Sequence, residues 1–438
     1  MYNIYPIADK TPSKTSKIFE LFFILYTVAV YCFNDQSQFL PYIYATYAGV
    51  IGFVLLKILF DVKKVVFFKE NVTLILYAIF CKASTLWAIS TPLADERSNT
   101  VIFFVTFAFF CIFYFTDTKS VDLILKSLTI AGVVLSVYTI IHYGGFSSFY
   151  YQATRDNARL GSGVGQTNSI GMHCAYTVVL LFYYAIYKKK FILYPVAIIP
   201  FIVSMASGSR KAVFIIALGI ALLLFLSQDN KRGSAAKWGK LLLIGIVAIF
   251  ACWVVLQLPI MATVTHRLEQ MFATFSGGDG DNSSYVRLEL TKAGLEQFKN
   301  APFVGVGVGN SFFVMREHTG LFAYSHNDYI EQLVNGGIVG FVLYFGLFFS
   351  LVSSHIKLLN ERNPEIIISF TLLLIFLINA FGVVGYYNKA TYIFITLWIS
   401  VVKINRDKKE KIDEYLKENT AVRDRKNRTE YSKGFAKR

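Results

Sequence analysis

Three polar stretches of this sequence combine reactive residue types with positions beside long apolar runs. Arg210 and Lys211 stand in SGSRKAV, Arg287 stands in SSYVRLELTKAGLEQFKNAP, and His326 stands in YSHNDYIEQL. Arginine and lysine bind anions such as phosphates, and a histidine with a near-neutral pKa can take a proton from a hydroxyl. These residue types would suit a reaction in which a hydroxyl displaces an anionic leaving group.

Arg210 and Lys211 lie in a short connection between two apolar runs. The amides and hydroxyls of the preceding Ser207, Gly208 and Ser209 would suit an anion near the membrane surface. The alternative is that both cations extend to lipid headgroups.

Arg287 falls in a predicted helix that Ser284 would cap and that ends at Asn300. In the first turn of a helix the dipole disfavours a cation, unless an anion is shared with the free N–H groups there. An ion pair with Glu289 or Asp281 would also account for this arginine.

His326 precedes Asn327 and Asp328, and either of these can cap the helix that follows. A cap would hold the histidine at one membrane surface. The residues alone allow both a catalytic base and a purely structural role.

Long apolar stretches dominate the chain and predict a membrane protein. Of 438 residues, 55% are hydrophobic and 16% are aromatic, which is more than a soluble domain buries. Because about 20 apolar residues cross a bilayer as a helix, we expect an all-α polytopic membrane protein with about 12 transmembrane helices. The predicted spans are 18–33, 39–60, 72–90, 98–115, 121–143, 169–187, 191–207, 211–227, 240–260, 328–350, 365–385 and 390–403.

Charge asymmetry predicts the orientation of these spans. Most of the 43 Lys and Arg residues fall near the N-terminus, in alternate connections and after residue 403. Cytoplasmic segments collect positive charge, so we expect both termini in the cytoplasm and the three polar stretches on the other face. The net charge of +15 then reflects topology and requires no nucleic acid.

This orientation divides the chain into four parts. Residues 1–260 carry spans 1 to 9, and residues 261–325 form one large, partly helical extracytoplasmic loop between spans 9 and 10. Residues 326–403 carry spans 10 to 12, and residues 404–438 form a charged cytoplasmic tail, partly helical or disordered. The cysteines lie in predicted spans, and we expect them to be small apolar side chains: Cys32, Cys81, Cys111, Cys174 and Cys252.

Two further features allow more than one interpretation. Lys82 is predicted near the middle of a span, where it either faces a hydrophilic cavity or reaches the surface. The glycines of VGVGVGNSF predict a flexible turn, and they resemble a phosphate-binding loop only superficially because no Gly-Lys-Ser/Thr follows.

The order and spacing of SGSRKA, YVRLELTKAGLEQF and SHNDYIEQLVNGGIVGF on one face resemble the O-antigen ligase and polysaccharide polymerase superfamily. The similarity covers roughly residues 200–350. It implies an integral-membrane glycosyltransferase of the bacterial cytoplasmic (inner) membrane. Its donor would be an undecaprenyl-diphosphate-linked oligosaccharide, and neither metal nor cofactor is expected.

The resemblance also implies roles for single residues. Arg210 and Arg287, supported by Lys211, would hold the lipid diphosphate, and His326 would be the base for the acceptor hydroxyl. Possible supporting residues are Asp328 or Glu331 beside the imidazole, Lys82, and, in the outer segment 144–168, Tyr150, Tyr151, Arg155 and Arg159 along a path for sugars. Loop packing explains the residues of segment 144–168 almost equally well.

Two activities fit this superfamily. The motifs look more like those of capsule, exopolysaccharide and O-antigen polymerases, which join repeat units, than like those of ligases, which transfer a finished glycan to lipid A core or another acceptor. A flippase or transporter for lipid-linked glycans is a third, less favoured interpretation, because a pathway would place cations throughout the spans. Partners implied by the resemblance are the acceptor glycan, membrane lipid, a chain-length regulator and a flippase.

Overall fold

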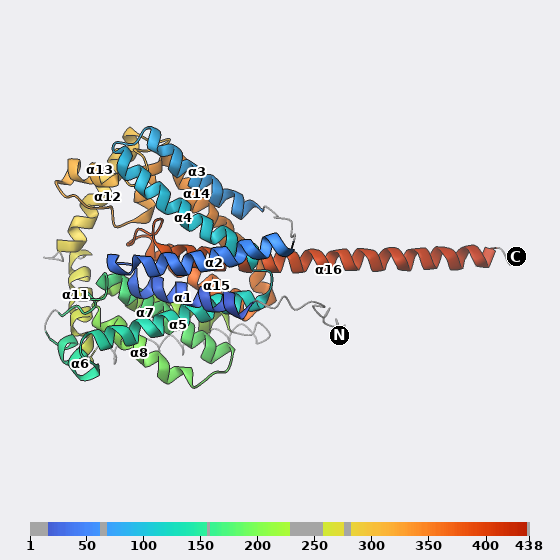
Figure 1. The fold of residues 1–438 in the computed structure, drawn as a ribbon, viewed down its shortest axis with the longest axis horizontal. Coiled ribbons are helices and arrows are strands. Elements are labelled where there is room, and N and C mark those ends of the chain that lie inside the picture. The colour runs from blue at the N-terminus through green and yellow to red at the C-terminus, as the bar shows by residue number, and fades with distance from the viewer. Residues whose placement is uncertain (1–15, 62–67, 156–157, 228–256, 276–281, 436–438) are drawn as a thin grey trace.

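The computed structural model describes residues 16–61, 68–155, 158–227, 257–275 and 282–435, and these residues form helices without strands (Figure 1). Every predicted span coincides with a helix except 240–260, of which residues 240–256 lie outside the described part of the chain. These helices are α1 (Lys17–Phe33), α2 (Leu40–Asp61), α3 (Lys69–Ala83), α4 (Thr91–Tyr114), α5 (Thr118–His142), α7 (Thr167–Tyr187), α8 (Leu193–Ala206), α9 (Arg210–Leu226), α14 (Asp328–Leu358), α15 (Pro364–Asn379) and α16 (Lys389–Phe435).

Several of these helices could cross a membrane. Among the described residues, five segments are long and apolar enough by length and composition: Ser37–Phe60, Thr91–Tyr114, Thr118–His142, Thr167–Tyr187 and Asp328–Glu361. Helices α8 and α15 are apolar but shorter. The predicted all-helical architecture is therefore confirmed for the described residues and is consistent with a polytopic membrane protein, whereas the number of about 12 spans stays a prediction.

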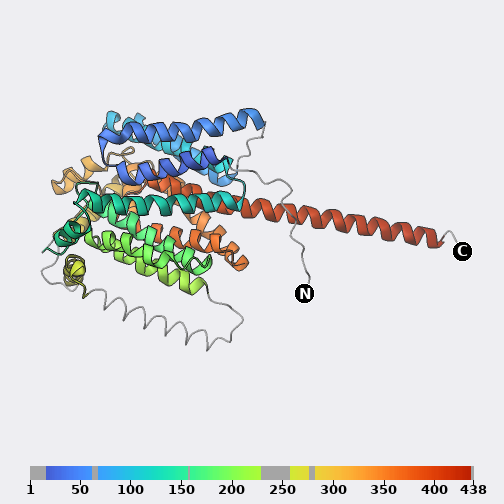
Figure 2. The ribbon, with the colours of Figure 1, turned by 60° about the horizontal axis from the view of Figure 1, so that its bottom comes forward.

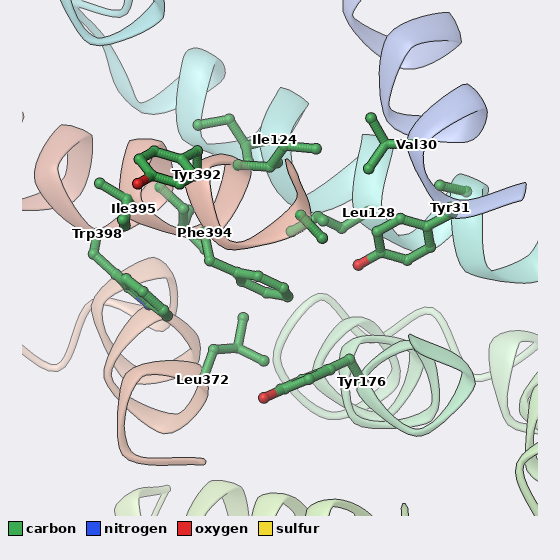
Figure 3. Close-up of a cluster of buried hydrophobic side chains, with 14 of the residues drawn as sticks. Val30, Tyr31, Ile124, Leu128, Tyr176, Leu372, Tyr392, Phe394, Ile395 and Trp398 are labelled. Carbon is green, nitrogen blue, oxygen red and sulfur yellow. The ribbon is translucent and has the colours of Figure 1, made fainter. Parts of the chain in front are cut away.

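The first part of α16 runs through the centre of the bundle. Figure 3 shows side chains from four other helices around it, and the buried cluster includes Val30, Tyr31, Ile124, Leu128, Tyr176, Leu372, Tyr392, Phe394, Ile395 and Trp398. The rings of Tyr176 and Phe394 lie 5.1 Å apart, and those of Phe394 and Trp398 lie 5.7 Å apart. Beyond the bundle α16 continues as a single helix to Phe435, so the charged tail is helical up to that residue (Figure 2).

Four further helices gather at the end of the bundle that lies away from this tail (Figures 1 and 2). They are α6 (Phe146–Ala153), α11 (Ala262–Phe275), α12 (Asn282–Asn300) and α13 (Ser311–Thr319). The first comes from the predicted outer segment 144–168, and the other three come from the predicted loop 261–325. Both segments thus cover the same end of the bundle.

A sharp kink interrupts α14 at Gly337, which has φ 58° and ψ −159°. The loop after α12 enters this kink and completes the broken backbone bonding. Ile338 N–H donates to the Pro302 carbonyl at 2.8 Å, and Val306 N–H donates to the Val334 carbonyl at 3.0 Å. The glycine-rich stretch therefore fills a gap in a helix, which explains why its backbone must come so close.

The same loop is bonded to the turn between α3 and α4. Ile89 N–H donates to the Val306 carbonyl at 3.2 Å, and Val308 N–H donates to Ser84 Oγ at 3.0 Å. Helix α3 ends at Ala83 although the apolar run continues beyond it, and residues of the turn that follows are bonded to this loop instead. The predicted span 72–90 is therefore too long at its C-terminal end.

This early end corrects the expected position of Lys82. The residue lies in the last turn of α3, not near the middle of a span. Its ammonium group is partly exposed, pairs with the Asp95 carboxylate and donates to Asn99 Oδ1 at 2.9 Å. Lys82 thus belongs to a local polar group at the end of the helix.

Replacement of Gly337 by alanine should strongly destabilise the protein. The new Cβ would lie 2.4 Å from the backbone carbonyl of Phe303, and the positive φ is unfavourable for alanine. Gly346→Ala is the matched control, because its Cβ would find only Val342 Cγ1, 3.9 Å away, and alanine favours a helix. Thermal unfolding in detergent should show a lower melting temperature for Gly337→Ala alone. Equal melting temperatures for the two variants would contradict the role given to the kink.

Candidate functional site

The turn between α8 and α9 fixes Arg210 at the loop-covered end of the bundle. Gly208 adopts φ 63° there, and Arg210 is 8% exposed. Arg210 Nη1 donates to the Arg267 carbonyl at 3.1 Å, and Arg267 Nη1 donates to the Gly208 carbonyl at 2.6 Å. This reciprocal pair ties α11 to the turn. Burial and bonding together argue against the alternative in which Arg210 extends to lipid headgroups.

Lys211 reaches the segment between α15 and α16. Its Nζ donates to the carbonyl of Gly382, and the side chain is half-buried. The contact links the start of α9 to the connection that precedes the central helix.

Arg287 lies one turn further along its helix than the sequence predicts. Helix α12 already begins at Asn282, so Ser284 is not its cap and Arg287 is in the second turn. The predicted place of Arg287 in the first turn is therefore wrong, and the sharing of an anion with the N–H groups of that turn stays a prediction. Glu289, one of the suggested partners, forms an ion pair with Lys292 at 2.8 Å.

Five cations from four segments meet at this end of the protein, and we call them the cationic cluster: Arg159, Arg210, Lys211, Arg267 and Arg287. Burial lowers the pKa of Arg159, and the charge of Arg210 lowers it further. Positive charge thus prevails around this side chain. An anion placed among these groups would be attracted by several of them at once.

The charges of the cationic cluster also act on His326. Burial, followed by the charges of Arg287 and Lys211, lowers the pKa of His326 to about 4. The imidazole is therefore neutral at physiological pH and can accept a proton. The residue has φ 57°, an unfavourable conformation for a side chain of this kind, and its ring centroid lies 4.1 Å from that of Tyr324.

The helix cap predicted beside this histidine is confirmed. Asn327 Oδ1 accepts hydrogen bonds from Tyr329 N–H at 3.0 Å and from Ile330 N–H at 3.3 Å. The cap begins α14 immediately after His326 and so fixes the backbone that carries the imidazole.

Glu331 is the centre of a buried hydrogen-bond network beneath the histidine loop. Its carboxylate accepts from Ser325 N–H at 3.1 Å, Ser325 Oγ at 2.7 Å, Asn335 Nδ2 at 3.1 Å and Ser311 Oγ at 2.5 Å. It therefore holds the residue before His326 and acts on the imidazole through the backbone. The network also ties the start of α13 to α14.

Asp328 is directed to the segment between α15 and α16. Its Oδ2 accepts from Gly385 N–H at 3.1 Å and from Tyr344 Oη at 3.3 Å, and its own N–H donates to the Ala380 carbonyl at 2.7 Å. Asp328 thus anchors the helix start to its neighbours, and these bonds do not involve the His326 ring.

A cavity of about 380 Å³ connects these elements. Lys211, Tyr324 and His326 line one part of it. Other lining residues come from the ends of α1, α4, α7 and α16: Asn34, Asp35, Arg97, Gln166, Asn168, Tyr387, Asn388 and Lys389. The volume lies in the range of about 300–1,000 Å³ that is usual for ligand sites.

The structure places the other predicted site residues in different surroundings. Arg159 joins the cationic cluster and donates to Asn168 Oδ1 at 2.8 Å, so it lies closer to Arg210 than a role in a sugar path assumed. Arg155 lies over the ring of Tyr151, 4.6 Å from its centroid, and donates to its hydroxyl at 3.0 Å. Of the predicted site residues, Lys211 and His326 line the cavity. Its lining does not include the others: Arg210, Arg287, Asp328, Glu331, Arg155, Arg159 and Lys82.

Sequence reasoning missed several residues of the site, including Arg267, Arg97, Lys389, Asp35 and Tyr324. Arg267 carries the same signal as Arg287, because it is a cation in the large loop. The others stand beside predicted spans, and no sequence feature separates them from ordinary loop residues.

The fold and the site together define a class of protein. It is an all-helical protein with helices able to cross a membrane, and one end carries a cavity with a neutral histidine beside a cluster of arginines and a lysine. This combination can bind an anionic group at a membrane surface and take a proton from a neighbouring hydroxyl.

The comparison with known families agrees with this class. Residues 195–345 match the family described as O-Antigen ligase, which confirms the resemblance to the O-antigen ligase and polymerase superfamily. The matched family is of the membrane glycosyltransferase type. The matched region contains Arg210, Lys211, Arg287 and His326. No curated protein matches the chain.

Loss of the Glu331 carboxylate should lower stability and disturb the histidine loop. In Glu331→Ala, the buried donors of Ser311, Ser325 and Asn335 would lose their acceptor, at a cost of about 1–3 kcal/mol for each group. Glu317→Ala, at an exposed position of α13, is the control. Thermal unfolding should separate the two variants, and a wild-type melting temperature for Glu331→Ala would contradict the network.

Proposed function

We propose that this protein polymerises undecaprenyl-diphosphate-linked oligosaccharide repeat units into a surface polysaccharide at the extracytoplasmic face of the bacterial cytoplasmic membrane. One observation carries the proposal above all others. A histidine with a pKa of about 4 lines the same cavity as Lys211, beside a cationic cluster suited to a diphosphate. A neutral base and an anion site are the two requirements of glycosyl transfer from a lipid diphosphate.

The reaction follows from these two parts of the site. His326 takes the proton from the acceptor hydroxyl as the hydroxyl oxygen attacks the anomeric carbon of the donor sugar. The bond between that carbon and the phosphate oxygen breaks, and its electrons leave with undecaprenyl diphosphate. Attack from the opposite face inverts the anomeric centre.

The cationic cluster would act on the leaving group. Negative charge grows on the bridging oxygen as the bond breaks, and fixed guanidinium groups stabilise such charge in the transition state, as metal ions do in other enzymes. Arg210 is held by backbone carbonyl contacts before any substrate arrives, so little reorganisation is needed. Arg287 and Lys211 would hold the same diphosphate.

The proposed orientation rests on the charge asymmetry of the sequence. With both termini in the cytoplasm, the end that carries α6, α11, α12 and α13 faces outward, where the lipid-linked donor would be presented. A flippase would supply the donor to this face, and a chain-length regulator could limit the product.

Transfer of a finished glycan to lipid A core or another acceptor is the second candidate, because the matched family is described as O-Antigen ligase. Both activities use the same donor and the same chemistry. They differ in the acceptor, so the product separates them.

Purified protein incubated with a lipid-linked repeat unit extracted from the source organism should produce a ladder of glycan lengths. The measurement is gel separation of the labelled products. Transfer that appears only after a second acceptor is added would support the ligase and contradict the polymerase.

In the same assay, Arg210→Ala, Arg287→Ala and His326→Ala should each reduce turnover at least a hundredfold, because each removes a group used in the transition state. Arg316→Ala is the control, since Arg316 is an exposed cation of α13 in the same loop. Size-exclusion profiles would show that each variant is folded. Wild-type turnover by His326→Ala would contradict its assignment as the base.

A further inference from the structure

The cavity beside His326 has a second set of polar residues that comes from outside the region matched by the family. We call it the polar wall, and it consists of Asn34, Asp35, Arg97, Asn388 and Lys389. Its members follow α1, begin α16 or lie in the N-terminal part of α4, whereas the donor side comes from α9, α12 and the loop before α14.

Hydrogen bonds arrange the polar wall in advance. Lys389 Nζ donates to Asn34 Oδ1 at 2.8 Å, and Asn34 Nδ2 donates to Asp35 Oδ1 at 2.8 Å. The second carboxylate oxygen of Asp35 accepts from Gln166 N–H at 2.7 Å. The start of α7 therefore fixes the carboxylate on one side, and an amide and an ammonium group extend the chain of bonds on the other.

Arg97 completes this arrangement. Its guanidinium lies 4.7 Å from the centroid of the Tyr387 ring, which fixes the plane of the group. Arg97 Nε is buried and has no hydrogen-bond partner among the described residues. A buried donor without a partner is costly, so a ligand in the adjoining cavity could relieve this cost.

The charges of the polar wall differ from those of the donor side. The Asp35 carboxylate would repel a diphosphate, whereas the cationic cluster would attract it. A sugar hydroxyl both donates and accepts hydrogen bonds, so it can donate to Asp35 and accept from Arg97 or Lys389. A wall that offers a carboxylate, an amide, a guanidinium and an ammonium group therefore suits a hydroxyl-rich ring better than it suits an anion.

From this juxtaposition we propose that the polar wall is the acceptor subsite, which binds the terminal sugar of the acceptor glycan and directs its hydroxyl to His326. The inference rests on the proposed glycosyl transfer and adds the substrate that the second part of the cavity recognises. Asp35 and Arg97 are then specificity-determining residues, because a sugar that lacks the matching hydroxyls would leave their groups unsatisfied.

The test uses full-length protein in lipid nanodiscs and two independently varied probes. The donor is the lipid-linked repeat unit extracted from the source organism. The acceptor is the oligosaccharide released from that donor by mild acid and labelled with a fluorophore at its reducing end. Labelled product measures transfer, and fluorescence anisotropy measures acceptor binding directly.

Asp35→Asn and Arg97→Gln should each raise the KM for the acceptor at least tenfold and leave the KM for the donor unchanged. Glu96→Gln is the control, because Glu96 is an exposed carboxylate next to Arg97 that does not line the cavity. The two variants change different segments, the turn after α1 and helix α4, so a folding defect in one still leaves the other informative. Melting temperatures identify such a defect.

The outcomes separate this inference from the proposed function. An unchanged KM for the acceptor in both variants, or a raised KM for the donor, would overturn the acceptor subsite while transfer by the wild type supports the polymerase. A wild type that binds the acceptor without any transfer, together with variants that do not bind it, would support the subsite and overturn polymerisation. Absence of both binding and transfer in the wild type would overturn both.

Discussion

The gathering of like charges at one end of the bundle is the constraint on which the rest of the site depends. Cations repel one another unless an anion or fixed dipoles offset the repulsion, so their positions must be enforced by the fold. Arg210, Arg267 and Lys211 each donate to a backbone carbonyl of a different segment. A neutral carbonyl can hold a cation in place without cancelling its charge. The resulting positive field has two consequences: it would attract the diphosphate of the proposed donor, and together with burial, which is the larger cause, it keeps His326 neutral.

The packing of the loops onto the bundle makes this arrangement possible. The glycine-rich stretch after α12 fills the kink of α14 at Gly337 and is bonded at the same time to the turn between α3 and α4. Glu331 then fixes the loop that carries the histidine. Contacts among segments that are far apart in the sequence thus set the positions of the cationic cluster and of His326. In this way the site is organised before substrate binds.

The helices were predictable because bilayer thickness sets the length of an apolar run, and α5 and α7 begin and end close to the spans predicted for them. The cap by Asn327 was predictable because it depends on neighbouring residues alone. The early end of α3 was not predictable, since the apolar run continues while Ser84 and Ile89 after the helix bond to a loop more than two hundred residues away. Arg267 and the polar wall escaped prediction for the same reason: their partners become neighbours only after folding.

The most direct test of the central claim compares the acid limbs of two pH profiles for glycosyl transfer. The profile of kcat/KM reports the free enzyme, and that of kcat reports the enzyme with donor bound. With His326 as the base, activity should fall as pH decreases through its pKa, which lies at about 4 in the free enzyme. The bound diphosphate should offset the positive charges of Arg287 and Lys211 and so raise the pKa of His326. The acid limb of the kcat profile should therefore lie at higher pH than that of the kcat/KM profile. Full recovery at neutral pH after acid exposure would exclude irreversible inactivation, and circular dichroism at the acid pH would show that the protein stays folded there. Acid limbs that coincide in the two profiles would contradict the role given to the cations beside His326. An acid limb of kcat/KM near the ordinary histidine pKa of about 6.5 would contradict it as well.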